Sequence, residues 1–262
     1  MQTLLDLDQF PLDRPHTPEW QALVDQCRAD LAAEGMFNLD GFMRPAVAAK
    51  VAETLAPKFD SDSFTHARQH NIYFKKSIPG LAADHPALRQ FETSNRTLCA
   101  DQLGQNALIQ LYEWEPFATF LAATMGKDQL YTMADPLARV NVMSYYAGQA
   151  LNWHFDRSEF TTTLLLQAPD QGGAFEYRSD LRSDDDPNYD GVAKLLNGQD
   201  DQAKEITLSA GTLNVFAGKN TAHRVTPVEG EANRVIAVFS YYERQGVSFS
   251  YEERIGFYGR AA

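Results

Sequence analysis

Short runs of β-branched and aromatic residues fill the C-terminal half of the chain, and glycine, proline and asparagine separate them. Runs of this length and composition are typical of β-strands. The predicted strands cover residues 139–146, 160–167, 172–177, 211–216, 222–228 and 234–242. The pattern therefore predicts a β-rich fold from about residue 131 to residue 262.

The first 130 residues have a different pattern, in which apolar residues recur at helical spacing. Helix start signals, in which a proline falls in the first turn, occur at Thr17-Pro18-Glu19, Arg44-Pro45 and Glu115-Pro116. Gly35 and Gly126 are expected to end the first and third of these helices, and residues 86–104 are expected to be helical too. We expect one domain over residues 1–262, with mainly helical support in 1–130 and a β core in 131–262.

Composition narrows the classes of function. The chain carries 23 Lys and Arg against 35 Asp and Glu, a net charge of −12, which disfavours a phosphate-binding surface and hence a nucleic-acid partner. We find no basic N-terminal segment followed by an apolar stretch and no run of 18 apolar residues, so we expect no membrane partner and a cytoplasmic location. Cys27 and Cys99 lie far apart without metal-site spacing, and we expect two buried, reduced thiols.

One segment of the β-rich half interrupts the strands. Residues 179–190 (SDLRSDDDPNYD) begin an acidic insertion that extends to about residue 204. Its charges and proline predict a solvated loop. A lid over a binding site is the alternative, since long loops between strands often close active sites.

His154, Asp156 and His223 form the strongest chemical signal in the chain. In an extended segment His154 and Asp156 point to the same side and reach one metal ion, and His223 from a distant strand adds a third ligand. Two imidazoles and one carboxylate leave the opposite face of an octahedron open, as Fe(II) needs to hold a chelating oxoacid and bind O2. Arg234, eleven residues after His223, suits the far carboxylate of that oxoacid.

The segment from about residue 139 to residue 243 resembles the double-stranded β-helix (jelly-roll, cupin-like) core of the Fe(II)/2-oxoglutarate dioxygenases. The resemblance rests on His154-x-Asp156, Gly172-Gly173-x-Phe175, Gly211-Thr212-Leu213, His223 and Arg234. Within that superfamily, NWHFDRSEFTTTLLLQ and FAGKNTAHRVTPV are most similar to the radical halogenases of free amino acids, such as the lysine chlorinase, and to their hydroxylating relatives. The resemblance implies a metal site of His154, Asp156 and His223, with Fe(II), 2-oxoglutarate and O2 as cofactor and co-substrates.

Asp156 departs from the halogenase pattern, which has a small residue there that leaves room for chloride. The resemblance therefore implies hydroxylation of an unactivated C–H bond in a free L-amino acid, with lysine the leading candidate. A homodimer is a separate expectation. The alternatives are hydroxylation of a protein or peptide residue, and a zinc-binding or non-catalytic cupin-like protein. Arg234 argues against a simple zinc hydrolase, which needs no cation at that place.

Five further residues are candidates for the same site. Tyr146 is expected to bind the distal carboxylate of the oxoacid beside Arg234, as its counterpart in the superfamily often does, or to pack as an ordinary strand tyrosine. Thr163 is a cofactor-binding candidate on the next strand, although β-propensity alone explains a threonine there. Arg157 is a candidate for substrate contact, or alternatively part of an exposed ion pair with Glu159. Asp135 and Ser240 are two further candidates for substrate contact, with less support from the sequence.

Overall fold

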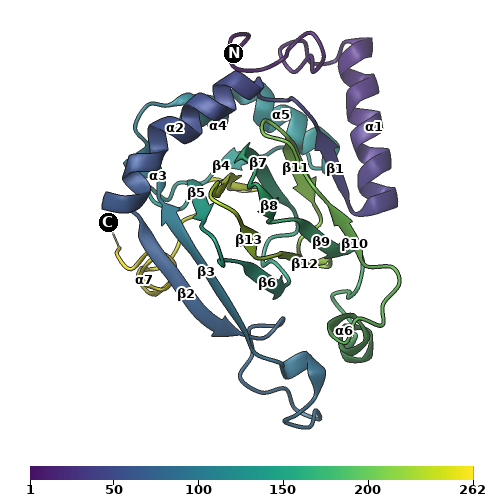
Figure 1. Ribbon diagram of the computed structural model, residues 1–262. Helices are drawn as coiled ribbons and strands as arrows, with labels where there is room; N and C mark the ends of the chain where they lie inside the picture. The colour runs from purple at the N-terminus through teal and green to yellow at the C-terminus, as the bar shows by residue number, and fades with distance from the viewer. Residues whose placement is uncertain (262) are drawn as a thin grey trace.

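The computed structural model describes residues 1–261, in which two antiparallel β-sheets face each other (Figure 1). The larger sheet has the strand order β1 (Met36–Leu39), β11 (Leu213–Phe216), β7 (Thr161–Gln167), β14 (Arg234–Phe239), β5 (Val140–Tyr145), β3 (Phe91–Leu98) and β2 (Phe64–His70). The smaller sheet has the order β10 (Lys204–Ile206), β9 (Phe175–Arg178), β12 (Ala222–Val225) and β6 (Leu151–His154). Two short ribbons pair β13 (Val228–Glu229) with β8 (Gln171–Gly172) and β15 (Tyr241–Tyr242) with β4 (Tyr131–Thr132).

Helices cover the outer face of the larger sheet, where α2 runs across the top of the molecule in Figure 1. These helices are α1 (Pro18–Glu34), α2 (Pro45–Ser61), α3 (Ala100–Leu103), α4 (Ala107–Tyr112) and α5 (Glu115–Thr124). The helices α6 (Tyr189–Leu196) and α7 (Tyr251–Tyr258) and the 3₁₀ turn η1 (Pro86–Leu88) pack in other apolar clusters. The predicted boundaries of α1 are confirmed, because Thr17 accepts a hydrogen bond from the backbone N–H of Trp20 and Gly35 ends the helix at φ 74°. Within residues 1–261, no helix is both long enough and apolar enough to span a membrane.

Alternation along each strand of the larger sheet divides its side chains between two environments. On β14, Val235, Ala237 and Phe239 join the core beneath the helices. Arg234 and Ile236 point to the other side, toward the smaller sheet, as their neighbours across the strands do. The space between the sheets is filled by a second apolar cluster of Met36, Phe175, Tyr177, Phe216 and Val225. These facing sheets confirm the predicted double-stranded β-helix core.

The expectation of a helix over residues 86–104 is wrong. Only η1 and α3 are helical there, and β3 lies between them and pairs with both β2 and β5. The buried side of β3 consists of Thr93, Asn95 and Thr97, so the strand lacks the apolar alternation by which a sequence shows a half-buried strand. The first 130 residues therefore contribute three strands, β1, β2 and β3, to the larger sheet in addition to the helices that support it.

The acidic insertion is only partly the solvated loop that its composition predicts. Residues 184–186 are exposed, but the helix α6 follows. Leu181, Val192 and Leu195 of this segment pack in one apolar cluster with Trp153 and Phe155, which flank His154. The insertion is thus anchored beside the strand that carries the predicted metal ligand, and its role as a lid stays a prediction.

The two cysteines lie in the interior, as predicted. Both thiols are free and buried, and burial raises the pKa of Cys27 to about 12 and that of Cys99 to about 11.

Candidate metal centre

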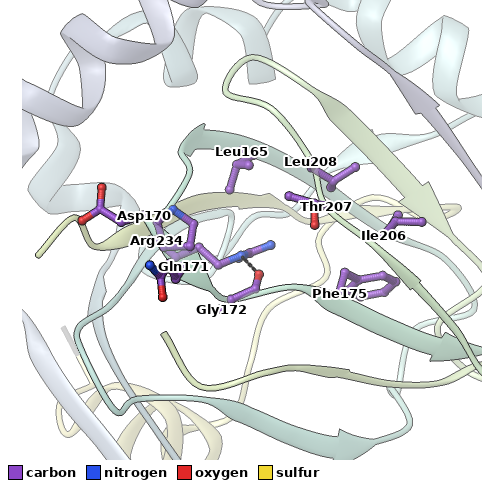
Figure 2. A pocket seen from close by; sticks show the side chains of 11 residues that line it. Leu165, Asp170, Gln171, Gly172, Phe175, Ile206, Thr207, Leu208 and Arg234 are labelled. Carbon is purple, nitrogen blue, oxygen red and sulfur yellow. Dashed lines mark hydrogen bonds between the residues drawn. The ribbon is translucent and has the colours of Figure 1, made fainter. Parts of the chain in front are cut away.

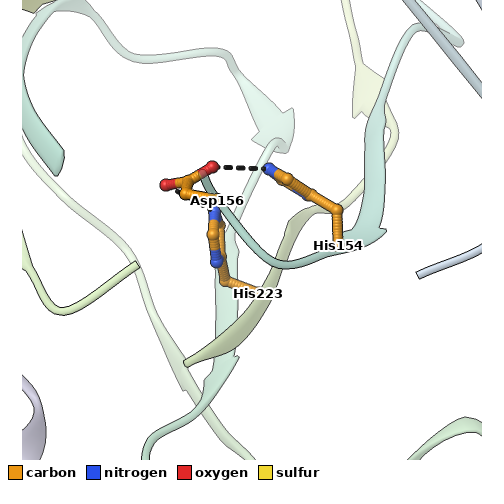
Figure 3. Close-up of side chains that lie close together, drawn as sticks. All are labelled: His154, Asp156 and His223. Carbon is orange, nitrogen blue, oxygen red and sulfur yellow. Dashed lines mark ion pairs between the residues drawn. The ribbon is translucent and has the colours of Figure 1, made fainter. Parts of the chain in front are cut away.

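The structure brings His154, Asp156 and His223 together in the space between the sheets (Figure 3). His154 ends β6, and His223 lies directly opposite it on β12, with the two ring centroids 4.1 Å apart. Asp156 follows two residues after His154. The Nε2 atom of His154 lies 3.3 Å from Asp156 Oδ1, and the Nε2 atom of His223 lies 3.5 Å from Asp156 Oδ2. Three donor atoms from two strands thus converge on one point.

The hydrogen bonds of the two imidazoles favour a bound cation. In each ring Nδ1 lies against a backbone carbonyl, 2.8 Å from that of Asn152 for His154 and 2.9 Å from that of Thr221 for His223. A carbonyl accepts only, so Nδ1 carries the proton in each neutral ring and Nε2 presents a lone pair. Two lone pairs then face a carboxylate, an arrangement that a positive ion stabilises. Carbonyl-oriented imidazoles of this kind are usual at metal sites.

Protonation states and distances fit the same interpretation. Burial lowers the pKa of His154, which keeps its ring neutral. Ligand atoms about 2.1 Å from one ion, at right angles to one another, are about 3 Å apart. The two distances from histidine nitrogen to aspartate oxygen, 3.3 and 3.5 Å, are close to this value, and the ligand atoms of all three residues lie within 4.8 Å of one another, so the three residues fit a facial metal site.

Asp156 is held in place by contacts that the sequence did not reveal. Its Oδ2 atom accepts a 2.5 Å hydrogen bond from the hydroxyl of Thr161, the first residue of β7. Its backbone N–H donates to the carbonyl of Gly218 at 3.0 Å. A Cβ atom added at Gly218 would lie 2.3 Å from Asp156 Oδ2, so only glycine leaves room for this carboxylate. The aspartate is thus oriented toward the imidazoles by its neighbours.

Arg234 lies in a cavity of about 220 Å³ between the sheets (Figure 2). The cavity is lined by, among others, Leu165, Gly173, Phe175, Ile206 and Leu208. The Arg234 side chain is buried, and its Nε donates to the carbonyl of Gly173 at 3.1 Å. Within residues 1–261 its Nη1 is also buried and has no hydrogen-bond partner. A buried guanidinium with an unpaired N–H donor is stabilised by an anionic ligand that accepts this hydrogen bond and compensates the charge.

Tyr145, and not Tyr146, shares the interior with Arg234. The two residues are paired across β5 and β14, and the guanidinium lies 6.0 Å from the Tyr145 ring centroid. Burial raises the pKa of Tyr145 to about 12, and its hydroxyl donates to the sulfur of Met143 at 3.7 Å. Tyr146 points outward, where its hydroxyl donates to Asp60 at 3.1 Å. The prediction for Tyr146 is therefore wrong by one residue, because adjacent strand residues face opposite sides.

The two other strand candidates differ in position. Thr163 is buried and lies opposite Val238 of β14, on the face that Arg234 also occupies, and it makes only long contacts of 3.4 Å to Asn214. Its role as a cofactor ligand stays a prediction. Ser240 was expected on the same face, but β14 ends at Phe239. The Ser240 hydroxyl donates instead to the carbonyl of Ala138 at 3.1 Å, which contradicts the expected substrate contact.

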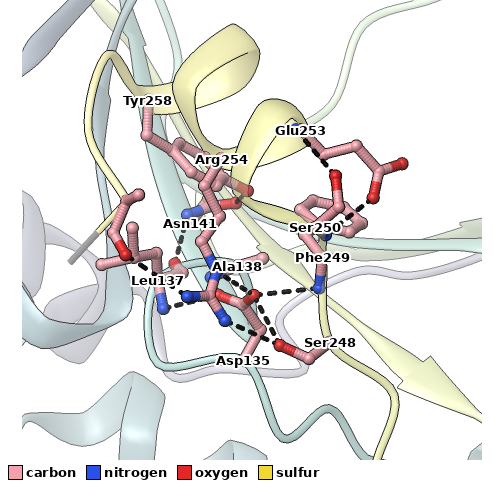
Figure 4. A network of polar contacts seen from close by, with 11 residues as sticks. Asp135, Leu137, Ala138, Asn141, Ser248, Phe249, Ser250, Glu253, Arg254 and Tyr258 are labelled. Carbon is pink, nitrogen blue, oxygen red and sulfur yellow. Dashed lines mark hydrogen bonds and ion pairs between the residues drawn. The ribbon is translucent and has the colours of Figure 1, made fainter.

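Asp135 is fully buried and serves the chain itself (Figure 4). Its carboxylate accepts hydrogen bonds from five donors in the first and last parts of the β core. The donors are the backbone N–H groups of Leu137, Ala138 and Phe249, the hydroxyl of Ser248 and Nε of Arg254. No oxygen is left for an amine, so the hypothesis that Asp135 recognises substrate is wrong. Its hydrogen bonds instead secure the segment that leads into α7.

Arg157, the remaining substrate candidate, lies one residue beyond Asp156. Its side chain is 75% exposed and pairs with Glu253 of α7 at 2.9 Å. The alternative ion pair with Glu159 does not form, because Glu159 pairs with Lys127 at 2.7 Å. Arg157 therefore stays a candidate for substrate contact.

Comparison with known proteins agrees with this geometry. A family model described as Halogenase D matches residues 19–254 of the chain. Among solved structures, AviO1 from Streptomyces viridochromogenes Tue57 is 16% identical with a TM-score of 0.56, and the match covers 85% of this chain and 96% of that chain. A prolyl hydroxylase from Trichoplax adhaerens, in complex with a hypoxia inducible factor peptide fragment, is 12% identical with a TM-score of 0.54, covering 87% and 94%.

An oxidoreductase of the 2OG-Fe(II) oxygenase family from Burkholderia pseudomallei is 14% identical with a TM-score of 0.51, covering 86% of this chain and 92% of that chain. At these identities the likeness concerns the fold. No curated protein matches the chain.

Proposed function

Because the chain belongs to the Halogenase D family, we propose that it is an Fe(II)- and 2-oxoglutarate-dependent oxygenase that hydroxylates a free L-amino acid. The observation that supports this proposal is that a three-residue metal site and a buried arginine with an unpaired N–H donor occur in the same space between the sheets. His154, Asp156 and His223 provide three metal ligands, and Arg234 offers a buried, unsatisfied donor in the neighbouring cavity. A dicarboxylic oxoacid satisfies both, with one end on the metal and the other on the guanidinium.

Each residue then has a defined task. The three ligands hold the iron, Arg234 pairs with the distal carboxylate of 2-oxoglutarate, and the buried Tyr145 ring packs beside the Arg234 guanidinium. Bound Fe(II) with 2-oxoglutarate supplies the oxidising power: one atom of O2 enters the substrate as hydroxyl, the other enters succinate, and CO2 is released. Phe175, which lines the cavity and lies 5.6 Å from the His223 ring, helps to exclude water from this space.

Asp156 supports hydroxylation over halogenation. A carboxylate at this position occupies the coordination site where a halogenase binds chloride. Thr161 and Gly218 orient the Asp156 carboxylate toward the two imidazoles, which is the orientation that a third metal ligand requires. The side chain therefore leaves no vacancy for a halide beside the two histidines.

The choice of amino acid is the finer part of the proposal. The family resemblance favours lysine, but Asp135, the carboxylate that was expected to hold an amine, is buried and fully hydrogen-bonded. Support for lysine thus comes from the resemblance alone.

A substrate screen tests the proposal. Protein loaded with Fe(II) is given 2-oxoglutarate and O2, and succinate release is measured with each of the twenty amino acids and ornithine. We expect one or a few amino acids to accelerate succinate release and to gain the mass of one oxygen atom. Zn(II) in place of Fe(II) is the control, because zinc accepts the same ligands but has no redox chemistry. Equal activity with both metals, or no 2-oxoglutarate turnover with any amino acid, would contradict the proposal.

A further inference from the structure

The metal triad is accessible from the side of Asp156 and Phe74. The Asp156 side chain is 21% exposed, whereas those of His154 and His223 are 8% and 3% exposed. Phe74 is 43% exposed, and its ring lies 6.1 Å from the ring of His154, edge to face. A substrate that reaches the metal therefore passes the side chains around these two residues.

Arg68 lies on this side of the site without a partner. It belongs to β2 and lies opposite the buried Thr93 of β3, so its side chain is on the inner face of the larger sheet. The guanidinium centre lies 4.2 Å from the centroid of the Phe74 ring. Among residues 1–261 no carboxylate pairs with Arg68 and no hydrogen bond to its guanidinium is formed. A half-buried cation beside a metal site thus has its donors free.

Arg157 adds a second positive charge nearby. Its guanidinium lies 5.4 Å from the ring centroid of Phe257 in α7, and the C-terminal end of that helix packs against Phe64 of β2, the strand that carries Arg68. Burial lowers the pKa of the Arg68 guanidinium, and the charge of Arg157 lowers it further. Within residues 1–261 the ion-pair partner of Arg157 is the exposed Glu253, and exposed ion pairs contribute little stability, so a substrate anion competes easily for it. Arg68 on β2 and Arg157 in the loop after β6 therefore lie on the side from which a substrate reaches the metal.

A third arginine strengthens the positive potential. The guanidinium of Arg182 lies 4.0 Å from the ring of Phe155, the residue between His154 and Asp156. Its Nε donates to the carbonyl of Lys219 at 2.8 Å. An ammonium group brought here meets like charges, whereas a carboxylate is attracted and finds free N–H donors.

We propose that the substrate is an acidic L-amino acid, whose two carboxylates are received by Arg68 and Arg157. This inference rests on the proposed function and names its substrate class. It differs from lysine, the substrate expected from the resemblance. The α-carboxylate and the side-chain carboxylate each gain a guanidinium partner, and the C–H bond to be hydroxylated lies between them, facing the metal.

Matched acids and amides test the inference in the iron-loaded protein. Succinate release is measured with glutamate, aspartate, glutamine, asparagine, lysine and ornithine, because each amide differs from its acid by one charge at nearly constant shape. We expect one of the two acids to exceed its amide roughly 10- to 100-fold in kcat/KM, the range for one charge-assisted pair. Lysine and ornithine are expected to be the poorest substrates.

Three variants assign the effect to the arginines. Arg68→Gln and Arg157→Gln are each expected to raise KM for the acid about 10-fold or more, and Arg157→Glu is expected to raise turnover of lysine relative to glutamate. Lys50→Gln is the matched control, because it removes one positive charge from the exposed face of α2, where Lys50 is 71% exposed. The control is expected to keep the wild-type preference for the acid. Iron binding by each variant is measured alongside to show that it folds.

The inference is overturned by a preference for lysine or ornithine over both acids, or by an acid-to-amide ratio that neither arginine variant changes. A protein that binds iron and 2-oxoglutarate but accepts no acidic amino acid refutes only the substrate class. A protein that binds neither refutes the proposed function itself.

Discussion

Replacement of Arg234 by methionine separates its role in binding 2-oxoglutarate from any role in folding. Methionine fills much of the same space without the charge. The arginine is buried, and within residues 1–261 its Nη1 has no partner, so the ligand-free protein carries an uncompensated charge there. We therefore expect Arg234→Met to leave the ligand-free protein as stable as the wild type, or more stable. Its affinity for 2-oxoglutarate is expected to fall steeply.

The size of the effect follows from the lost ion pair. A charge-assisted pair contributes about 1.5 to 3 kcal/mol, which corresponds to an affinity roughly 10- to 150-fold weaker. At a concentration of 100 times the wild-type Kd, 2-oxoglutarate stabilises the wild type by about 2.7 kcal/mol. The same concentration then stabilises the variant by only about 0.3 to 1.4 kcal/mol.

Thermal unfolding without oxygen, with Fe(II) present and 2-oxoglutarate titrated, measures both quantities. Arg139→Met is the control, because Arg139 lies beside the same sheet but pairs with Glu113 at the surface. The control is expected to keep the full ligand-dependent rise in Tm. The reasoning fails if Arg234→Met keeps that rise as well, or if the ligand-free variant is several kcal/mol less stable than the wild type.

Four further substitutions test the rest of the site. His223→Ala is expected to abolish stoichiometric Fe(II) binding because it removes one of three protein ligands, and iron analysis of the purified variant checks this. Asp156→Gly is expected to reduce hydroxylation sharply, and an unchanged rate in the succinate assay would show that the carboxylate is no ligand. Thr161→Val removes the hydrogen bond to that carboxylate, so iron binding, followed by titration, is expected to weaken about 10- to 100-fold. Burial lowers the pKa of His70 to about 4, so folding favours the neutral imidazole. The free energy of unfolding therefore falls as the pH decreases from about 6.5 toward 4, by at most roughly 3 kcal/mol. His70→Asn is expected to flatten this acid limb of the Tm-against-pH curve, whereas a limb of unchanged slope would exclude His70 as its source.

The sequence was sufficient to predict most strands of the larger sheet and β12, which carries His223, but not β6, which carries His154. β5, β7, β11 and β14 are rich in apolar and β-branched residues, because one face packs on helices and the other faces the smaller sheet. The spacing of His154 and Asp156 also predicted their convergence with His223. These features depend on local alternation, which a sequence displays directly.

The polar strands β2 and β3 could not be predicted in the same way. Their inner faces hold threonine, asparagine, histidine and arginine, since they border the approach to the metal and not an apolar core. A strand whose buried side is polar gives no hydrophobic period. For that reason Arg68 was not recognised as a site residue before the structure placed it opposite Thr93.

The choice between Tyr145 and Tyr146 failed for a related reason. Tyr145 ends β5 and Tyr146 follows it, and only the register of β5 against β14 shows which of them lies beside Arg234. Asp135 illustrates a second kind of error. Its isolated carboxylate was noticeable in the sequence, but its five donors come from segments more than a hundred residues apart as well as from its own turn. Long-range pairing of this kind is not visible in local sequence.

The mass of the product formed in chloride buffer tests the central claim most directly. Iron-loaded protein is incubated with 2-oxoglutarate, O2 and the amino acid that most strongly stimulates succinate release. We predict a product heavier by one oxygen atom, with that atom derived from labelled O2 and no chlorinated product, because Asp156 occupies the position that a chloride ion would need. A chlorinated amino acid formed by the wild-type protein would contradict the account.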